Sequence, residues 1–515
     1  MWVRRASFGC YFVMLHFTLF LYFAILIGIG IVASRRVGDL ADFFVAGKKL
    51  GYWVVAFSAR ATGESAWLLL GLTGLGAAVG LSAFWVVIGE VAGVAISWFV
   101  LAPPFKKHSD RFGSITVPDY LVSTFEERGA SKDQTKLLRG LAAGALALFV
   151  TIYVSAQIDA TGKAFESFLA WHYYAGIFVG FGIVVIYTFA GGFVAVAWSD
   201  LFQGSIMLIG LVALPLAALV VMPDISSLRI QMEAVDPSLT SIWGARGFSV
   251  EGILVVISFL AIGLGFLGSP QVYVRFMSLR RPEELRQGRW VAVVYTLLTD
   301  GAAVLTGIFG RYLLVGDGDL ETILGPAGED VLPQMAASIF PPLIVGFYVA
   351  AVLSAIMSTI DSLLIVASSA VTRDFYQQIY HPEMGNRQLT RLSRTATLLL
   401  ASVALLLAVT VSLVSPGRTI FWYVIFGWSG IAATFCPTVI LSLFYKRFSV
   451  RAAIGAMCTG LVAVPLCQFA LPSLPVVGEY FGLVGEMAPA FALSLMVGLL
   501  LPVIDRKGSA AENEE

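Results

Sequence analysis

The sequence predicts an all-helical integral membrane protein, and three observations support that prediction. Of its 515 residues, 58% are hydrophobic and only 13% are charged, whereas soluble domains carry about 25% charged residues. Apolar runs of about 20 residues, enough for a helix to cross the hydrocarbon core, recur almost to the C-terminus. The connectors between these runs are too short to fold separately. We therefore predict a single domain over residues 1–515 with about thirteen transmembrane helices.

The predicted spans are centred near residues 24, 62, 92, 154, 182, 208, 262, 302, 355, 404, 431, 462 and 494. Most of the 33 Lys and Arg residues fall in connectors on one side, including "KKHSDR" and "YKRFSVR". Because basic connectors stay in the cytoplasm, we expect a multi-pass protein of the cell (inner) membrane, with its N-terminus outside and its C-terminus in the cytoplasm. Arg4 and Arg5 disagree with this topology, and a start at Met14 would remove them. The acidic tail, 505–515, is expected to be disordered.

The composition excludes several classes of protein. The formal net charge is zero, which argues against a nucleic-acid-binding protein that works through bulk positive charge. The four cysteines form no CxxC pair, and the four histidines are scattered, so no metal or other cofactor is predicted. No nucleophile–base set or phosphate loop occurs at a plausible spacing, and an enzyme is therefore not expected.

Two spans contain interruptions at matching places. The second span includes "RATGESA", and the seventh includes "GLGFLGSP", Gly263 to Pro270. Glycine and proline interrupt a helix and leave backbone groups without hydrogen-bond partners. Such groups are tolerated in the membrane only where they line a cavity or are buried in protein. Each interruption opens a block of five spans, the pattern of an inverted-repeat transporter with a binding site near the midplane. The repeats are predicted at 50–222 and 251–445. Flanking helices are predicted at 14–34, 452–472 and 484–504.

Charged residues lie within the second span. Arg60 and Glu64 are four residues apart, so a helix places them on one face. Two interpretations remain open: a neutralised structural bridge, or a Glu64 that lines a cation site while Arg60 tunes it or holds the broken helix. The same spacing suggests a pair between Asp159 and Lys163.

The ninth span is rich in oxygen-bearing side chains. Asp361 lies among several serines and threonines, and Asp200 begins the sixth span. Hard cations prefer several oxygen ligands at short range. Ser358 with Asp361 or Ser362 presents such oxygens on one helix face, which favours a cation-binding role over simple helix packing.

These residues, with their surroundings, resemble the sodium/solute symporter family and most closely its proline-transporting members. The resemblance extends over nearly the whole chain from about Met14 and includes "FFVAGKKLG", "SAWLLLGLTG", "TFAGGFVAVAWSD", "GLGFLGSPQVYVRFM" and "AIMSTIDSLLIVASSAVTRDFY". It implies a LeuT-type core of ten helices in two inverted five-helix repeats, with broken second and seventh helices. It also implies import of a small solute coupled to sodium.

The resemblance further implies a sodium site between the second and ninth spans. Its ligands would be the carbonyls of Ala61, Glu64 and Ala355 and the hydroxyls of Ser358 and Thr359. In some family members an acid on the sixth span and hydroxyls on the ninth hold another sodium ion. The matching residues here are Asp200, Ser358, Asp361 and Ser362.

The implied solute-binding residues are Thr62, Gly63, Ser65, Trp67, Tyr153, Ile262 and Phe266, and Arg60 and Pro270 are assigned structural or tuning roles. Three positions depart from the proline symporter. Gly63 replaces an aspartate important for sodium, Ile262 replaces a tryptophan, and Phe266 replaces a tyrosine. The last two changes remove hydrogen-bond donors, which can decide specificity. We expect proline or a related small amino acid, with a monocarboxylate as the alternative.

Two other mechanisms remain open. Glu64 or Asp361 could couple transport to protons, because buried carboxylates can titrate near neutrality. The chain could also be a transporter-like sensor, although such sensors usually continue into a soluble signalling domain. The expected partners are the solute, sodium and the lipid bilayer. The oligomeric state is open, and a monomer is sufficient for this mechanism.

Overall fold

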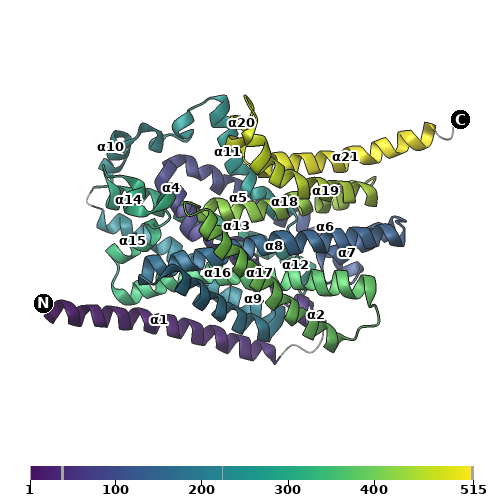
Figure 1. Ribbon diagram of the computed structural model, residues 1–515, viewed down its shortest axis with the longest axis horizontal. Coiled ribbons are helices and arrows are strands. Elements are labelled where there is room, and N and C mark those ends of the chain that lie inside the picture. Colours follow the sequence, from purple (N-terminus) through teal and green to yellow (C-terminus); the bar gives the residue numbers. More distant parts are fainter. Residues whose placement is uncertain (1, 36–39, 223, 512–515) are drawn as a thin grey trace.

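The computed structural model describes residues 2–35, 40–222 and 224–511, and these residues contain helices and no strand. Most of the long helices run side by side along one common direction (Figure 1). Within this described part, eleven helical segments are long and apolar enough to cross a membrane. The predicted all-helical membrane architecture is confirmed.

Two long helical segments contain a break. The segment Trp67–Arg111 has 45 residues, about twice the length that a single crossing needs, and its backbone turns at Gly80 with a φ of 60°. Helix α9, Tyr173–Val221, is broken at Gly192 with a φ of 56°. Both angles lie in the region that favours glycine. Of the eleven apolar segments in the described part, Trp67–Arg111 counts as two crossings because of its turn, and the shorter apolar helix Tyr173–Ile183 adds one more. Together they account for the thirteen predicted crossings.

The first predicted repeat, 50–222, follows two N-terminal helices. Those helices are α1 (Trp2–Ser34) and α2 (Leu40–Val45). The elements of the repeat are α3 (Tyr52–Gly63), η2 (Trp67–Leu72), α4 (Thr73–Val79), α5 (Phe84–Ile96), η4 (Ser97–Leu101), α6 (Ala102–Arg111), α7 (Val117–Glu127), α8 (Lys132–Leu169) and α9. Helix α10 (Ser226–Val235) then leads to the second repeat.

The second predicted repeat, 251–445, contains α11 (Val250–Ala261), η7 (Ile262–Leu267), α12 (Pro270–Ser278), α13 (Leu285–Gly310), η9 (Arg311–Val315), α14 (Leu320–Leu324), α15 (Val331–Ile339), α16 (Pro342–Ser369), η11 (Ala370–Tyr380), α17 (Asn386–Val414) and α18 (Ile420–Phe444). The chain ends with α19 (Val450–Pro465), η12 (Leu466–Ala470), α20 (Gly478–Val484) and α21 (Met487–Ala511). Helix α21 thus continues past residue 505, where disorder is expected, and residues 512–515 lie outside the described part.

The helices differ strongly in how much of their surface other helices cover. The most apolar windows of the α18 segment and of the segment formed by α16 and η11 are 89% and 83% buried, whereas the α17 window is 17% buried. Helix α16 packs against α1, α8 and α9. The ninth and eleventh spans therefore form the centre of the bundle, and α17 faces the lipid.

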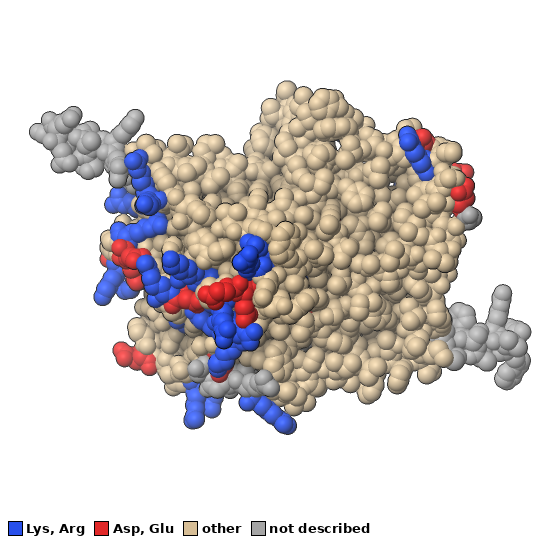
Figure 2. All heavy atoms as spheres, turned by 180° about the vertical axis from the view of Figure 1, so that it is seen from behind, with Lys and Arg blue, Asp and Glu red and all other residues tan. Residues whose placement is uncertain are grey.

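Charged side chains gather at one end of the molecule. Figure 2 shows Lys, Arg, Asp and Glu concentrated at one end, followed by a broad face almost without charge. The end that carries this concentration is called the basic end below, and the other is the far end. Helix α21 ends at the basic end, and α1 begins at the far end (Figure 1). An uncharged belt of this kind is the surface that a bilayer requires.

Close packing brings α5 against the interruption in the seventh span. A β-carbon added to Gly93 would lie 2.1 Å from the carbonyl oxygen of Gly263. One added to Gly263 would lie 1.9 Å from the carbonyl oxygen of Gly89. Small residues spaced four apart allow such close approach of helices within membranes. These glycines therefore fix the position of η7.

We expect Gly93→Ala to destabilise the protein by about 1–3 kcal/mol, because the new methyl group overpacks this contact. The matched control is Gly144→Ala in α8, where an added β-carbon meets nothing within 4 Å. Thermal unfolding of the detergent-purified variants measures the difference. Equal melting temperatures for the two variants would contradict the close packing described here.

Candidate transport site

The interruption in the second span exposes backbone carbonyls to side chains of α16. Helix α3 ends at Gly63, and the last carbonyls of a helix lack intrahelical donors. The Ser358 hydroxyl donates to the Ala61 carbonyl at 2.9 Å, and the Thr359 hydroxyl donates to the Thr62 carbonyl at 3.1 Å. Both hydroxyls also contact the Ala355 carbonyl, at 3.2 and 3.0 Å. Four of the five residues predicted to bind sodium are thus brought together.

The residues after the break contact α8. The Trp67 indole donates to the Gly63 carbonyl at 3.0 Å, across the break. The Tyr153 hydroxyl and the Gln157 amide both donate to the Ser65 hydroxyl at 3.2 Å. Gln157 also accepts from the backbone N–H of Ala66 at 3.0 Å. The sequence analysis missed Gln157, although it lies one helical turn after Tyr153 and on the same face.

The interruption in the seventh span is also satisfied by side chains. The Trp428 indole donates to the Ile262 carbonyl at 3.0 Å, and the Tyr273 hydroxyl donates to the Leu267 carbonyl at 3.0 Å. Pro270 then begins α12, at a position where its missing N–H removes no helical hydrogen bond. Trp428, on α18, is a second residue that sequence reasoning missed.

The two interruptions meet through aromatic rings. A β-carbon at Gly63 would lie 2.7 Å from the Phe266 ring, so the ring occupies the space that a side chain would fill. The ring centroids of Phe266 and Trp428 are 5.1 Å apart, and those of Tyr153 and Trp428 are 6.2 Å apart. All three rings are buried. Three of the predicted solute-binding residues, Gly63, Tyr153 and Phe266, are therefore brought together with Trp428 in one buried, largely aromatic region.

Arg60 and Glu64 form the predicted pair within a larger buried cluster. The Arg60 Nη2 atom lies 2.8 Å from a Glu64 carboxylate oxygen and 3.7 Å from Glu90. The Thr299 hydroxyl contacts Glu64 at 2.9 Å and Asp300 at 3.2 Å. The Glu64 carboxylate thus belongs to a buried polar cluster formed by side chains from α3, α5 and α13. This geometry favours the interpretation of Arg60 and Glu64 as a structural bridge.

The residues predicted for a further cation surround an arginine. Arg275 donates to Asp200 at 2.9 Å and to the hydroxyl oxygens of Thr62 and Ser362 at 2.5 Å. Asp361 accepts from the Ser362 hydroxyl at 3.3 Å. Ser358, the fourth predicted member, contacts Ala61 as described above. Arg275 was not identified from the sequence as a member of this set.

Comparison with known proteins identifies the family. The family model "Sodium:solute symporter family" matches residues 43–460. The chain belongs to the sodium:solute symporter family. The predicted family is confirmed, and the chain is a transporter rather than an enzyme.

Curated relatives match along at least 90% of their length. The chain is 35% identical to a high-affinity proline transporter of Bacillus subtilis (strain 168), over 95% of the chain and 97% of the relative. It is 31% identical to an osmoregulated proline transporter of the same organism, with 95% of each covered. It is 33% identical to sodium/proline symporter 2 of Staphylococcus saprophyticus, over 92% and 90%.

Solved structures show the same fold at low identity. A Na⁺-coupled sialic acid symporter matches with a TM-score of 0.73 and 18% identity, over 95% of this chain and 97% of the other. MhsT in complex with L-phenylalanine matches with a TM-score of 0.51 and 18% identity, over 87% and 97%. The predicted LeuT-type fold is therefore confirmed.

The predicted pair between Asp159 and Lys163 is wrong in this transporter. Asp159 instead pairs with Arg418 and accepts from Tyr173. Lys163 lies 3.1 Å from Glu329. Asp159 and Lys163 both have partners that are distant in sequence, because the end of α8 is covered by the connectors before α15 and α18.

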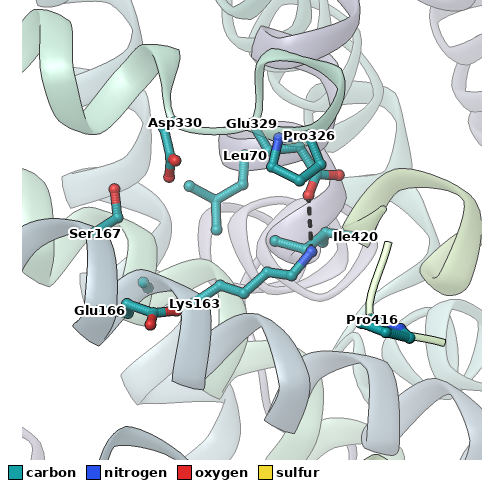
Figure 3. A pocket seen from close by; sticks show the side chains of 10 residues that line it. Leu70, Lys163, Glu166, Ser167, Pro326, Glu329, Asp330, Pro416 and Ile420 are labelled. Atoms are coloured by element: carbon teal, nitrogen blue, oxygen red, sulfur yellow. Dashed lines mark hydrogen bonds and ion pairs between the residues drawn. The ribbon is translucent and has the colours of Figure 1, made fainter. Parts of the chain in front are cut away.

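A cavity of about 270 Å³ opens beside Lys163 at the far end. Figure 3 shows the Lys163 ammonium reaching Glu329, with Leu70 and Ile420 on the cavity wall. Burial raises the pKa of the Glu329 carboxyl above its ordinary value, and the charge of Lys163 opposes this only in part. Leu70 belongs to η2, so the cavity reaches the broken second span from the far end.

An ion-pair network closes the basic end. Asp119 on α7 pairs with Arg139 on α8 at 2.7 Å and with Arg373 on η11. Burial raises the pKa of Asp119, but the charges of Arg373 and Arg139 outweigh it, so the pKa lies below its ordinary value. Asp374 accepts from Arg139 at 3.1 Å and from Thr116 at 2.9 Å. The network therefore ties elements of the two repeats together.

We expect Trp428→Phe to weaken solute uptake and to lower stability by about 1–2 kcal/mol, because the buried Ile262 carbonyl loses its donor while the ring is retained. Trp422→Phe is the control, since Trp422 is 42% exposed on the same helix. Uptake kinetics and thermal unfolding measure the two effects. An unchanged Michaelis constant together with unchanged stability in Trp428→Phe would refute this role.

Proposed function

We propose that this symporter couples the entry of sodium to the import of proline or a closely related small amino acid. The observation that carries the proposal is the set of Ala61, Ala355, Ser358 and Thr359 oxygens between α3 and α16. The proposal is also supported by three relatives that are named as proline transporters and align with the chain over at least 90% of their length. The coupling ion agrees with the family to which the chain belongs.

The first step is sodium binding between the two repeats. The Ala61 and Ala355 carbonyls and the Ser358 and Thr359 hydroxyls lie within 2.9 to 3.2 Å of one another in hydrogen-bonded pairs. A set made only of neutral and backbone oxygens suits a hard monovalent cation. The Glu64 carbonyl remains the fifth expected ligand. The ion would replace these hydroxyl–carbonyl hydrogen bonds with ion–oxygen contacts.

The solute would bind beside this ion. Trp67, Tyr153, Ile262 and Phe266 supply an apolar lining, and Ser65 with the backbone near Thr62 and Gly63 supplies polar groups for a carboxylate. Helix N-termini favour anionic groups through their exposed amides, and a new helical segment begins after the break at Gly63. Phe266 occupies the space next to Gly63, which limits the volume left for a side chain. This arrangement supports a compact amino acid over a bulky one.

Coupling follows from the position of the sodium ligands. Helices α3 and α16 belong to different repeats, so an ion that bridges them stabilises the arrangement in which the solute site is formed. Each ligand then raises the affinity for the other by the same factor. One sodium ion that moves inward across a 100 mV inside-negative potential contributes about 2.3 kcal/mol. Both repeats are in one chain, so a monomer can complete the cycle.

The orientation of the molecule follows from its charge distribution. The basic end in Figure 2 is assigned to the cytoplasm because basic connectors are retained there. Helix α1 then begins outside and α21 ends inside. Sodium and solute that enter from outside would pass the Lys163–Glu329 pair. Their release into the cytoplasm would require the Asp119–Arg139–Arg373 network to open.

The direct test is uptake by proteoliposomes that contain the purified full-length chain. We expect labelled proline to accumulate when an inward sodium gradient is imposed, and unlabelled proline to compete more strongly than acetate or lactate. Uptake that ignores sodium and follows an imposed pH gradient would overturn the sodium assignment. Competition only by monocarboxylates would overturn the solute assignment.

We expect Ser358→Ala to raise the sodium concentration for half-maximal uptake on the order of tenfold, because a buried cation loses one oxygen ligand. The control is Ser368→Ala on the same helix, whose hydroxyl donates to the Ile365 carbonyl of its own helix at 3.1 Å. The readout is uptake as a function of sodium concentration. Identical sodium curves for both variants would exclude Ser358 as a ligand.

A further inference from the structure

A second cavity, of about 290 Å³, lies between the connector from α7 to α8 and the start of α19. The first of these segments supplies Arg128, and α8 itself adds Gln134. The start of α19 supplies Ser449 and Arg451. We call this space the basic cavity, because its lining contains two arginines and no acidic residue.

Direct contacts hold the walls of the basic cavity together. The Arg128 guanidinium donates to the Ser442 carbonyl at 2.6 Å and to the Phe448 carbonyl at 2.9 Å. The ring centroids of Phe125 and Phe448 are 5.6 Å apart. The final carbonyls of a helix carry partial negative charge, so Arg128 is held at the end of α18. The first repeat and the end of the second repeat therefore meet at this cavity.

The positive charge around the basic cavity is not neutralised by carboxylates. In the described part of the chain, three exposed basic residues at this place form no ion pair: Lys446, Arg447 and Arg451. The adjacent acid Glu127 pairs with Arg111 instead. Asp133, at the start of α8, does not line the cavity. An anion in the cavity would therefore meet attraction from several cations and no acidic lining residue.

The position of the basic cavity along the spans matches the headgroup layer of a bilayer. Three apolar segments begin or end beside it: Lys132–Leu169, Ile420–Phe444 and Val450–Ser473. The hydrocarbon layer therefore ends at this depth. Leu137, one turn after Gln134, is 60% exposed, and Phe444, at the end of α18, is 54% exposed. Charged side chains and the uncharged belt also adjoin at this end in Figure 2. A phospholipid, unlike a free anion, can use both kinds of surface.

We propose that the basic cavity binds the phosphate headgroup of an anionic phospholipid. Basic pockets between membrane helices are suited to such headgroups. Arg451 supplies a charged donor. Gln134 supplies its amide N–H groups, because its carbonyl oxygen already accepts from the Ser131 backbone at 3.1 Å. The bound lipid bridges the start of α8 and the start of α19, and it stabilises the folded protein by mass action.

The experiment measures the melting temperature of the purified full-length protein in mixed micelles that contain increasing mole fractions of phosphatidylglycerol. We expect phosphatidylglycerol to raise the melting temperature in a saturable way, whereas phosphatidylcholine has a much smaller effect. Native mass spectrometry should show retained phosphatidylglycerol on the same samples. The preference should weaken in about 1 M KCl, because the Debye length then falls to about 3 Å.

A pair of matched variants locates the effect. Arg451→Gln removes one cation from the cavity and should raise the half-saturating mole fraction of phosphatidylglycerol about fivefold. Arg451 is exposed and forms no ion pair in the described part of the chain, so this variant is expected to fold. Arg451→Lys keeps the charge and should stay close to the wild type. Arg387→Gln, an equal change of charge at an exposed residue of α17 outside the cavity, is the control.

Three results would overturn the proposal. One is an equal response of the wild type to phosphatidylglycerol and phosphatidylcholine. Another is the same lipid curve for Arg451→Gln and Arg387→Gln. The third is an equal rise in melting temperature with inorganic phosphate alone, which would assign the cavity to a free anion. None of these measurements requires sodium or solute, so they are independent of the proposed transport function.

Discussion

The structure depends on one constraint: a backbone polar group within the hydrocarbon layer must find a partner inside the protein. Both interrupted spans meet this constraint with side chains that lie outside the break itself. Ser358 and Thr359 satisfy the carbonyls at the end of α3, and Trp428 and Tyr273 satisfy those of η7. The partners of the second span are the hydroxyls of Ser358 and Thr359 and, at the Gly63 carbonyl, the Trp67 indole. Those of the seventh span include an indole and a phenol, which also supply apolar surface.

Buried ion pairs connect the same elements that the breaks separate. Arg60 joins α3 to α5 beside α13, and Arg275 joins α3, α9 and α16. Such pairs gain little net stability, because desolvation offsets the attraction between the charges. Their contribution is geometric: each guanidinium has several directed donors, so the helices pack in one register. In this transporter the register matters, because it determines which oxygens of α3, α9 and α16 lie next to one another.

The sequence was most informative where a physical requirement is local. Span positions follow from apolar length, and the two breaks follow from glycine, proline and charge within apolar runs. Ser358 was predicted because its hydroxyl shares one helix face with Asp361 and Ser362, whereas Thr359 was implied only by the family resemblance. Contacts between distant segments were not accessible in the same way. Gln157 and Trp428 were missed, and Asp159 was assigned its helical neighbour, because the true partners are brought close only by the packing of other spans.

The contact between Gly63 and Phe266 links one position in each repeat. The aromatic ring fits because glycine has no side chain there, and neither residue can change in size without affecting the other. Substitutions at these two sites should therefore behave as a unit rather than as independent changes. Both positions would therefore have to be redesigned together, with a larger residue on one repeat matched by a smaller one on the other.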